Sequence, residues 1–308
     1  MISAMFWNVE EGRLRAGWRI SLQILLVGVP LAILAAMGFY STQGSIPTRV
    51  ALTALPITLV SIFVLGRYID KRRFSDFGLQ LRQSAWWADY GFGALAGFIA
   101  ATSYVFLLLL VGWAELSPGM ASRLDVGSLV RALIIPFFAY VSVGIFEELI
   151  RTYQIRNITE ALAQTRLRVA GASLSAIILA SGWSVIGHLA SGDPYFLLFV
   201  FISAVIYGLC FLWTQRVALA MALHFAWDFT LSSIFLLGTE GAQEAALFVV
   251  SVRDAPSVDI NLLPILGIVP KLLMLFLVAA WIKRREGEVR LRRELAKPSL
   301  VIPAVDAA

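Results

Sequence analysis

The chain has 308 residues, of which 59% are hydrophobic and 15% are charged, and its formal net charge is +5. A soluble domain is typically about 45–50% apolar and about 25% charged. The composition therefore excludes an ordinary soluble protein and indicates an integral membrane protein.

Apolar segments recur along the chain at lengths close to the ~20 residues of helix that cross a bilayer. We identify eight of them, at residues 20–40, 50–66, 90–113, 132–150, 169–189, 194–213, 217–236 and 262–282. Lipid offers backbone groups no hydrogen-bond partner, so such segments are expected to be helical. The sequence predicts an all-α, polytopic transmembrane helix bundle of about eight spans.

The basic residues predict how this bundle is oriented. If the N-terminus is cytoplasmic, most of the 25 Lys and Arg fall on inside segments, as the positive-inside rule requires. We expect a multi-pass protein of the inner cell membrane with both termini in the cytoplasm. Residues 1–282 would form one transmembrane domain. Residues 283–308 would form a basic cytoplasmic tail that contacts anionic lipid headgroups, and no nucleic-acid partner is expected.

Ionisable side chains inside predicted spans are the strongest functional signal. They are rare in membrane proteins, generally face the bundle interior, and suggest a functional site by default. The chain has only two histidines, and both fall in or at the rim of a span. The candidates are Glu147, Glu148, Arg151, His188, His224, Asp228 and Lys271.

The spacing of the acids and the arginine indicates which side chains can meet. Glu147 and Arg151 are four residues apart and can pair on one helix face, and Glu148, three residues before Arg151, competes for it. His224 and Asp228, in "HFAWDF", are also four apart. An interfacial Glu–Arg ion pair is the purely structural alternative.

Carboxylates and imidazoles together suit two kinds of chemistry. They can activate water and stabilise an oxyanion, or they can ligate a divalent metal. Both kinds serve hydrolysis.

Four residues in spans have simpler interpretations. Lys271, beside Pro270, is expected to extend to the interface or to form an ion pair with a neighbouring helix, in preference to facing a polar cavity. Gly93 and Gly97 allow close helix packing. The single cysteine, Cys210, is expected to have a packing role.

Three short motifs follow in a familiar order: "EELIR", "SVIGH" and "HFAWD", on the fourth, fifth and seventh predicted spans. They resemble the CPBP family of intramembrane proteases, which includes the CAAX prenyl endopeptidases and bacteriocin-processing and immunity proteins. The family's usual motifs are E-E-x-x-x-R, F-x-x-x-H and H-x-x-x-N/D, and the similar core here covers about residues 130–236. "EELIR" is one residue shorter than its counterpart, and Ser184 stands where the family usually has Phe.

The resemblance implies a role for each matching residue. Glu147 would be the general base that activates water, and His188 and His224 would position that water. Asp228 would contribute to the oxyanion site in its protonated form, because an ionised Asp is a poor donor, or else it would act as a metal ligand or orient a histidine. Two further residues would have supporting roles: Glu148 and Arg151.

The resemblance leaves the cofactor open. A divalent metal such as zinc, held by Glu147, His188 and His224, and a metal-free mechanism are the alternatives. In either case the chain would be a CPBP-type intramembrane (metallo)endopeptidase, similar to CAAX proteases, that cleaves a membrane-associated peptide or protein. A catalytically inactive immunity or scaffold protein of the same fold is the alternative function, and a small proton-coupled transporter is a third.

A shared site poses a problem of depth in the membrane. His188 ends its predicted span on the side opposite to the end of the fourth span, where Glu147 lies. We therefore expect the fourth helix to continue beyond Arg151, as far as "TEALA", and the fifth helix to be displaced or steeply tilted.

Overall fold

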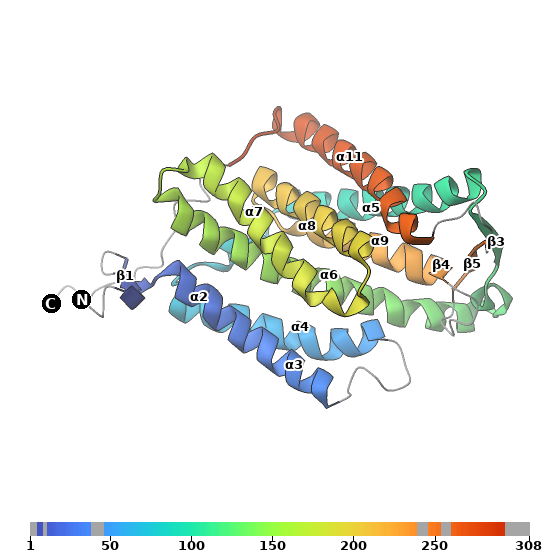
Figure 1. Ribbon diagram of the computed structural model, residues 1–308, viewed down its shortest axis with the longest axis horizontal. Helices are drawn as coiled ribbons and strands as arrows, with labels where there is room; N and C mark the ends of the chain where they lie inside the picture. The colour runs from blue at the N-terminus through green and yellow to red at the C-terminus, as the bar shows by residue number, and fades with distance from the viewer. Residues whose placement is uncertain (1–4, 9–10, 38–45, 239–245, 254–259, 293–308) are drawn as a thin grey trace.

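The computed structural model describes residues 5–8, 11–37, 46–238, 246–253 and 260–292 and is built almost entirely of helices (Figure 1). The predicted all-α bundle is confirmed. Its α-helices are α2 (Ala16–Gln23), α3 (Val29–Ala36), α4 (Ile46–Val64), α5 (Ser84–Leu110), α6 (Val126–Ala163), α7 (Arg168–Gly187), α8 (Pro194–Thr214), α9 (Ala218–Phe229), α10 (Leu263–Leu266) and α11 (Ile268–Glu286). Its strands are β1 (Trp7–Asn8), β2 (Arg13–Leu14), β3 (Ala114–Pro118), β4 (Phe235–Gly238) and β5 (Phe248–Val252).

Seven helical segments of the described residues are long and apolar enough to cross a membrane. An eighth apolar helix, Ala218–Ile234, falls short of that length and corresponds to the seventh predicted span. Its N-terminal part, α9, is enclosed by α5, α6 and α8 (Figure 1). A helix that is apolar all round is buried within its protein, so hydropathy alone made this inner helix look like a lipid-facing span.

Close packing of α5 on α9 depends on two glycines. A Cβ atom on Gly93 would lie 2.9 Å from the Cβ of Ala222, and one on Gly97 would lie 2.9 Å from the Cβ of Ala226. Real Cβ atoms essentially never approach so closely. The predicted role of both glycines in helix packing is confirmed. Cys210 is likewise fully buried in the apolar core, as expected.

Helix α6 is much longer than one membrane crossing. Its N-terminus is capped by the Asp125 carboxylate, which accepts hydrogen bonds from the backbone N–H groups of Gly127 and Ser128 at 3.0 and 3.1 Å. It runs for 38 residues, or about 57 Å at ~1.5 Å per residue. The predicted boundary at residue 150 is wrong, and the expected continuation to "TEALA" is confirmed.

The charges beyond residue 150 are neutralised inside the protein. Glu160 accepts hydrogen bonds from Arg13 and Arg19 at 2.9 and 2.5 Å and pairs with Arg72. Arg19 also pairs with Asp70 at 2.6 Å. Because these charged side chains pair with one another inside the bundle instead of binding water, α6 continues well past the end of its apolar segment.

A second ionic network lies at the same end of the bundle. Arg216 binds Asp89 at 2.5 Å and Glu286 at 2.6 Å, Arg285 binds Asp89 at 3.1 Å, and Arg292 pairs with Glu286. The first part of the predicted basic tail therefore contacts the protein itself. Residues from 293 onward lie outside the described residues, and lipid binding by the tail stays a prediction.

A three-stranded sheet lies at the opposite end of the bundle (Figure 1). Its strand order is β3-β5-β4, with β3 antiparallel and β4 parallel to the central β5. Strand β4 directly continues the helical segment Ala218–Ile234. The sheet thus anchors the far end of the helix that carries His224 and Asp228.

We predict that Gly97→Ala destabilises the bundle by about 1–3 kcal/mol, since an added methyl group would overpack the contact with α9. Thermal unfolding in detergent micelles measures the change. Gly91→Ala in the same helix is the matched control, because a Cβ there meets nothing within 4 Å. Its better helix propensity should leave stability equal or higher. Equal unfolding curves for the two variants would contradict the packing argument.

Candidate active site

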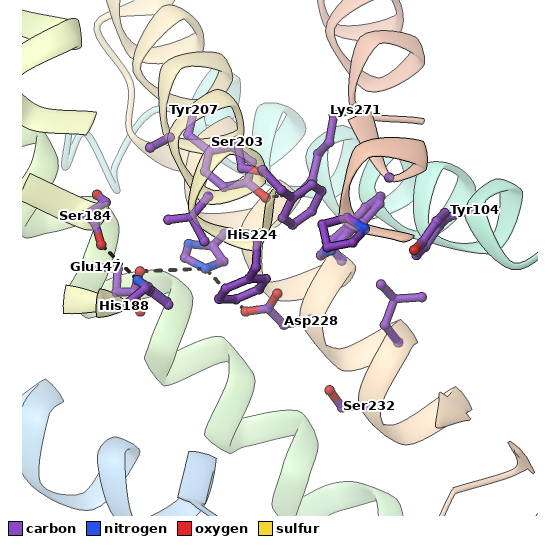
Figure 2. Close-up of a pocket in the computed structure, with 18 of the residues that line it drawn as sticks. Tyr104, Glu147, Ser184, His188, Ser203, Tyr207, His224, Asp228, Ser232 and Lys271 are labelled. Carbon is purple, nitrogen blue, oxygen red and sulfur yellow. Dashed lines mark hydrogen bonds and ion pairs between the residues drawn. The ribbon is translucent and has the colours of Figure 1, made fainter. Parts of the chain in front are cut away.

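A cavity of about 390 Å³ opens between the helices, and all four of the predicted catalytic residues line it, together with Arg151 and Lys271. Glu147 comes from α6, His188 follows the last residue of α7, and His224 and Asp228 come from α9. Figure 2 shows them on the wall of this cavity. Three helices thus bring two acids and two imidazoles to one cavity.

His224 is the residue that joins the acids. Its Nδ1 lies 2.8 Å from Glu148 Oε1, and its Nε2 lies 3.3 Å from Asp228 Oδ2 and 3.8 Å from Glu147 Oε2. Its ring stacks on Tyr207, with centroids 5.1 Å apart. An ionised carboxylate only accepts hydrogen bonds, so Nδ1 carries a proton that it donates to Glu148. This leaves Nε2 directed toward Asp228 and Glu147.

Arg151 pairs with Glu148. The predicted pairing of Arg151 with Glu147 is therefore wrong, and the alternative, in which Glu148 competes for Arg151, is correct. The guanidinium also donates to the Ser184 hydroxyl at 3.0 Å. Ser184, in place of the family's usual Phe, thereby links α7 to α6. The shortened "EELIR" motif still delivers its arginine to a glutamate because residues three apart share a helix face.

The Arg151–Ser184 bond also explains how His188 reaches the site. Helices α6 and α7 are consecutive and joined by a short turn, so they run in opposite directions. Four residues back from Arg151 on α6 is Glu147, and four residues on from Ser184 is His188. The two residues therefore lie at the same level, because α6 continues beyond Arg151 before the chain turns back. The expected displacement or tilt of the fifth helix stays a prediction. His188 Nδ1 lies 2.8 Å from the Ser184 carbonyl oxygen.

Lys271 does not extend to the interface. It is 1% exposed and lines the cavity. It makes no ion pair within the part of the chain that the structure describes, and its Nζ donates instead to the Tyr207 hydroxyl at 2.6 Å. The preferred interpretation from sequence was wrong, and the cavity-facing alternative holds. Lys271 lies in the first turn of α11, and its side chain is directed into the cavity.

Tyr207 and Ser203 are cavity residues that the sequence reasoning missed. Both lie in α8, within "FISAVIYG", four residues apart and therefore on one helix face. A hydroxyl pair at helical spacing inside an apolar span was the available signal. It is weaker than a charge, because hydroxyl groups are cheaper to bury.

The residues predicted as metal ligands are Glu147, His188 and His224. A catalytic zinc site requires three protein ligands. No three His, Cys, Asp or Glu side chains among the described residues are placed to hold a metal ion. Zinc binding therefore stays a prediction, and the mechanism below uses protein side chains alone.

Comparison with known proteins agrees with this geometry. Residues 129–230 match the family model described as type II CAAX prenyl endopeptidase Rce1-like. That family model is one of the CPBP family, which the three motifs resemble. The match supports a CPBP-type intramembrane protease fold, and with the apolar helices it identifies a multi-pass membrane protein. No curated protein and no solved structure matches the chain.

The matched segment contains the predicted site residues but not the whole cavity wall. Glu147, His188, His224 and Asp228 all lie within residues 129–230. Lys271, from α11, lies outside the segment, so the family match says nothing about its role.

We predict that Arg151→Met lowers the free energy of unfolding by about 3–5 kcal/mol, because it leaves the buried Glu148 carboxylate without its guanidinium. Thermal unfolding in detergent micelles is the measurement. The double variant Glu148→Gln with Arg151→Met should regain much of the loss.

Arg253→Met is the matched control for this prediction. It breaks an ion pair with Glu115 whose side chains are 50% and 66% exposed, so it should cost at most about 1 kcal/mol. If Arg151→Met is no more destabilising than Arg253→Met, the buried pair does not hold the site together.

Proposed function

We propose that this protein is an intramembrane endopeptidase that hydrolyses a peptide bond with a water molecule activated by Glu147. The observation that carries the proposal is the meeting of Glu147, His188, His224 and Asp228 around one cavity within a membrane helix bundle. The CPBP-type protease fold of residues 129–230 supports the same reaction class.

Exposure decides which glutamate is the base. The Glu148 side chain is 2% exposed and is already occupied by Arg151 and His224. The Glu147 side chain is 24% exposed and faces the cavity. Water reaches Glu147 and not Glu148, so we assign Glu147 as the general base and Glu148 as a positioning residue.

His224 is held in one orientation for this reaction. Its Nδ1–H donates to Glu148, and an imidazole fixed in this way presents Nε2 in a defined direction. The 3.8 Å between His224 Nε2 and Glu147 Oε2 is longer than a direct hydrogen bond. It is short enough for one water molecule to contact both atoms. Asp228, at 3.3 Å from Nε2, orients the ring, and this resolves the difficulty of using an ionised Asp as a donor.

The proposed reaction conserves its protons. Glu147 accepts a proton from water as the water oxygen bonds to the substrate carbonyl carbon. His188 and His224, each in its doubly protonated form, donate an Nε2–H hydrogen bond to the oxyanion that forms. Collapse of the tetrahedral intermediate breaks the C–N bond, and Glu147 returns the proton to the leaving amine. Acid–base catalysis of this kind contributes about 10²–10⁴-fold to the rate.

The substrate enters from the membrane in this proposal. A site enclosed by membrane helices admits peptides that are themselves membrane-associated. The matched family is described as prenyl endopeptidases, so S-prenylated peptides are the first substrate class to test. An inactive immunity or scaffold protein is the outcome if no peptide is cleaved.

We predict that Glu147→Gln lowers peptide turnover by about 10²–10⁴-fold. The assay uses purified enzyme in detergent and a mixed synthetic peptide library, with and without an S-farnesyl cysteine, and mass spectrometry of the products. His188→Ala and His224→Ala should also lose turnover while the protein remains folded.

Glu115→Gln is the matched control, because that glutamate is 66% exposed in β3 and outside the cavity. It should cleave as the wild type does. Turnover that survives in Glu147→Gln would refute the assignment of the base.

We also propose that the protein lies in the inner cell membrane and that both of its termini are in the cytoplasm. The two arginine-rich networks lie at the end of the bundle where α2 and α5 begin and α11 ends. Basic residues favour the cytoplasmic side.

A green fluorescent protein fused to the C-terminus should fluoresce, since it matures in the cytoplasm, and an alkaline phosphatase at that position should be inactive. Fusions after Gly119, in the connection from α5 to α6, should give the reverse pattern. The same pattern at both positions would contradict the orientation.

A further inference from the structure

Lys271 is a buried cation that the proposed mechanism does not use. It lines the same cavity as Glu147, His224 and Asp228 (Figure 2) and is 1% exposed. It lies outside the family-matched residues 129–230. A desolvated ammonium group is costly unless it is paired, so its position requires an explanation.

The surroundings of Lys271 stabilise the charge only in part. Its Nζ lies 3.8 Å from the ring centroid of Trp227, 4.9 Å from that of Tyr207 and 5.4 Å from that of Phe199. These are cation–π distances. Of the three donors of an ammonium group, the described structure assigns one, to the Tyr207 hydroxyl. The aromatic side chains hold the ammonium in place and leave donor capacity toward the cavity.

An anion that enters the cavity would complete this arrangement. The cavity wall already carries the carboxylates of Glu147 and Asp228, which disfavour a multiply charged group such as a phosphate. A single carboxylate, which pairs well with an ammonium, fits better. The ligand that must already enter this cavity is a peptide, and peptides carry carboxylates at the C-terminus and on Asp and Glu.

We propose that Lys271 binds a carboxylate of the peptide substrate and thereby selects the bond that is presented to Glu147. The proposal rests on the proposed endopeptidase function. Trp227, which packs against the ammonium, is adjacent in sequence to Asp228, which contacts His224. The cavity of about 390 Å³ is small for a ligand site. The bound carboxylate therefore lies within a few residues of the scissile bond.

The test uses three pools of one mixed-sequence synthetic peptide library, each with and without an S-farnesyl cysteine. The first pool has a free C-terminal carboxylate and no acidic side chain, the second a C-terminal amide and one Asp, and the third a C-terminal amide and no acid. The wild-type enzyme should cleave the first or the second pool about ten- to a hundredfold faster than the third, as expected for a charge-assisted contact. The preferred pool identifies the source of the carboxylate.

Lys271→Met should abolish this preference, and Lys271→Arg, which keeps the charge, should retain it. The ratio between pools is taken within each variant, so a smaller folded fraction does not alter it, and Lys271→Gln replaces the Met variant if that one does not fold. Lys283→Met, at the exposed end of the same helix, is the matched control and should keep the wild-type preference.

The outcomes separate the two proposals. Equal cleavage of all pools by the wild type, or a preference that survives in Lys271→Met and Lys271→Gln, overturns the role of Lys271 and leaves the endopeptidase standing. Cleavage of no pool by the wild type refutes the endopeptidase itself.

Discussion

Glu148 accepts two donors in the interior of this protein: the guanidinium of Arg151, from its own helix, and the imidazole of His224, from α9. Arg151 in turn binds Ser184 on α7. A single buried carboxylate thus links the three helices that supply the candidate catalytic side chains. A buried carboxylate is stable only while its partners remain. The contacts of Glu148 that join the helices therefore also orient His224 for the proposed reaction.

The buried charges of the bundle fall into two groups with different consequences. At the end where α6 and α11 terminate, arginines and acids pair with each other, as Arg19 does with Asp70 and Glu160. Such networks satisfy charge and hold helices together. Around the cavity the charges are compensated in part: Glu147 faces open space, and among the described residues the partners of the Lys271 ammonium are aromatic rings and the Tyr207 hydroxyl. A site for a polar substrate requires charged side chains on the cavity wall that are not fully paired with other protein groups.

The cavity also divides the chain into parts with different roles. The residues proposed to carry out hydrolysis come from the segment that matches the CPBP family. Part of the wall that would contact a substrate comes from outside it, with Lys271 on α11 and Leu237 on β4. In the proposed reaction, the groups that hydrolyse the peptide and the groups that select it therefore come from different segments of the chain.

The sequence by itself determined the membrane class, the helical fold and most of the candidate site. Hydropathy and helical spacing are local properties, and they were sufficient to locate the helices, to pick the glutamate pair and the two histidines as candidates, and to anticipate the close approach at Gly93 and Gly97. The choice of Glu147 over Glu148 came from the resemblance to the CPBP family. The tertiary structure decided which glutamate takes Arg151, that α6 continues to Ala163, and that Lys271 faces the cavity. Each of these outcomes depends on partners from distant segments, Ser184 and His224 for the glutamates, Arg13 for Glu160, and Tyr207 for Lys271. A charge in a membrane protein is stabilised by whichever group the fold places beside it, and that group cannot be read from the residues next to it in the chain.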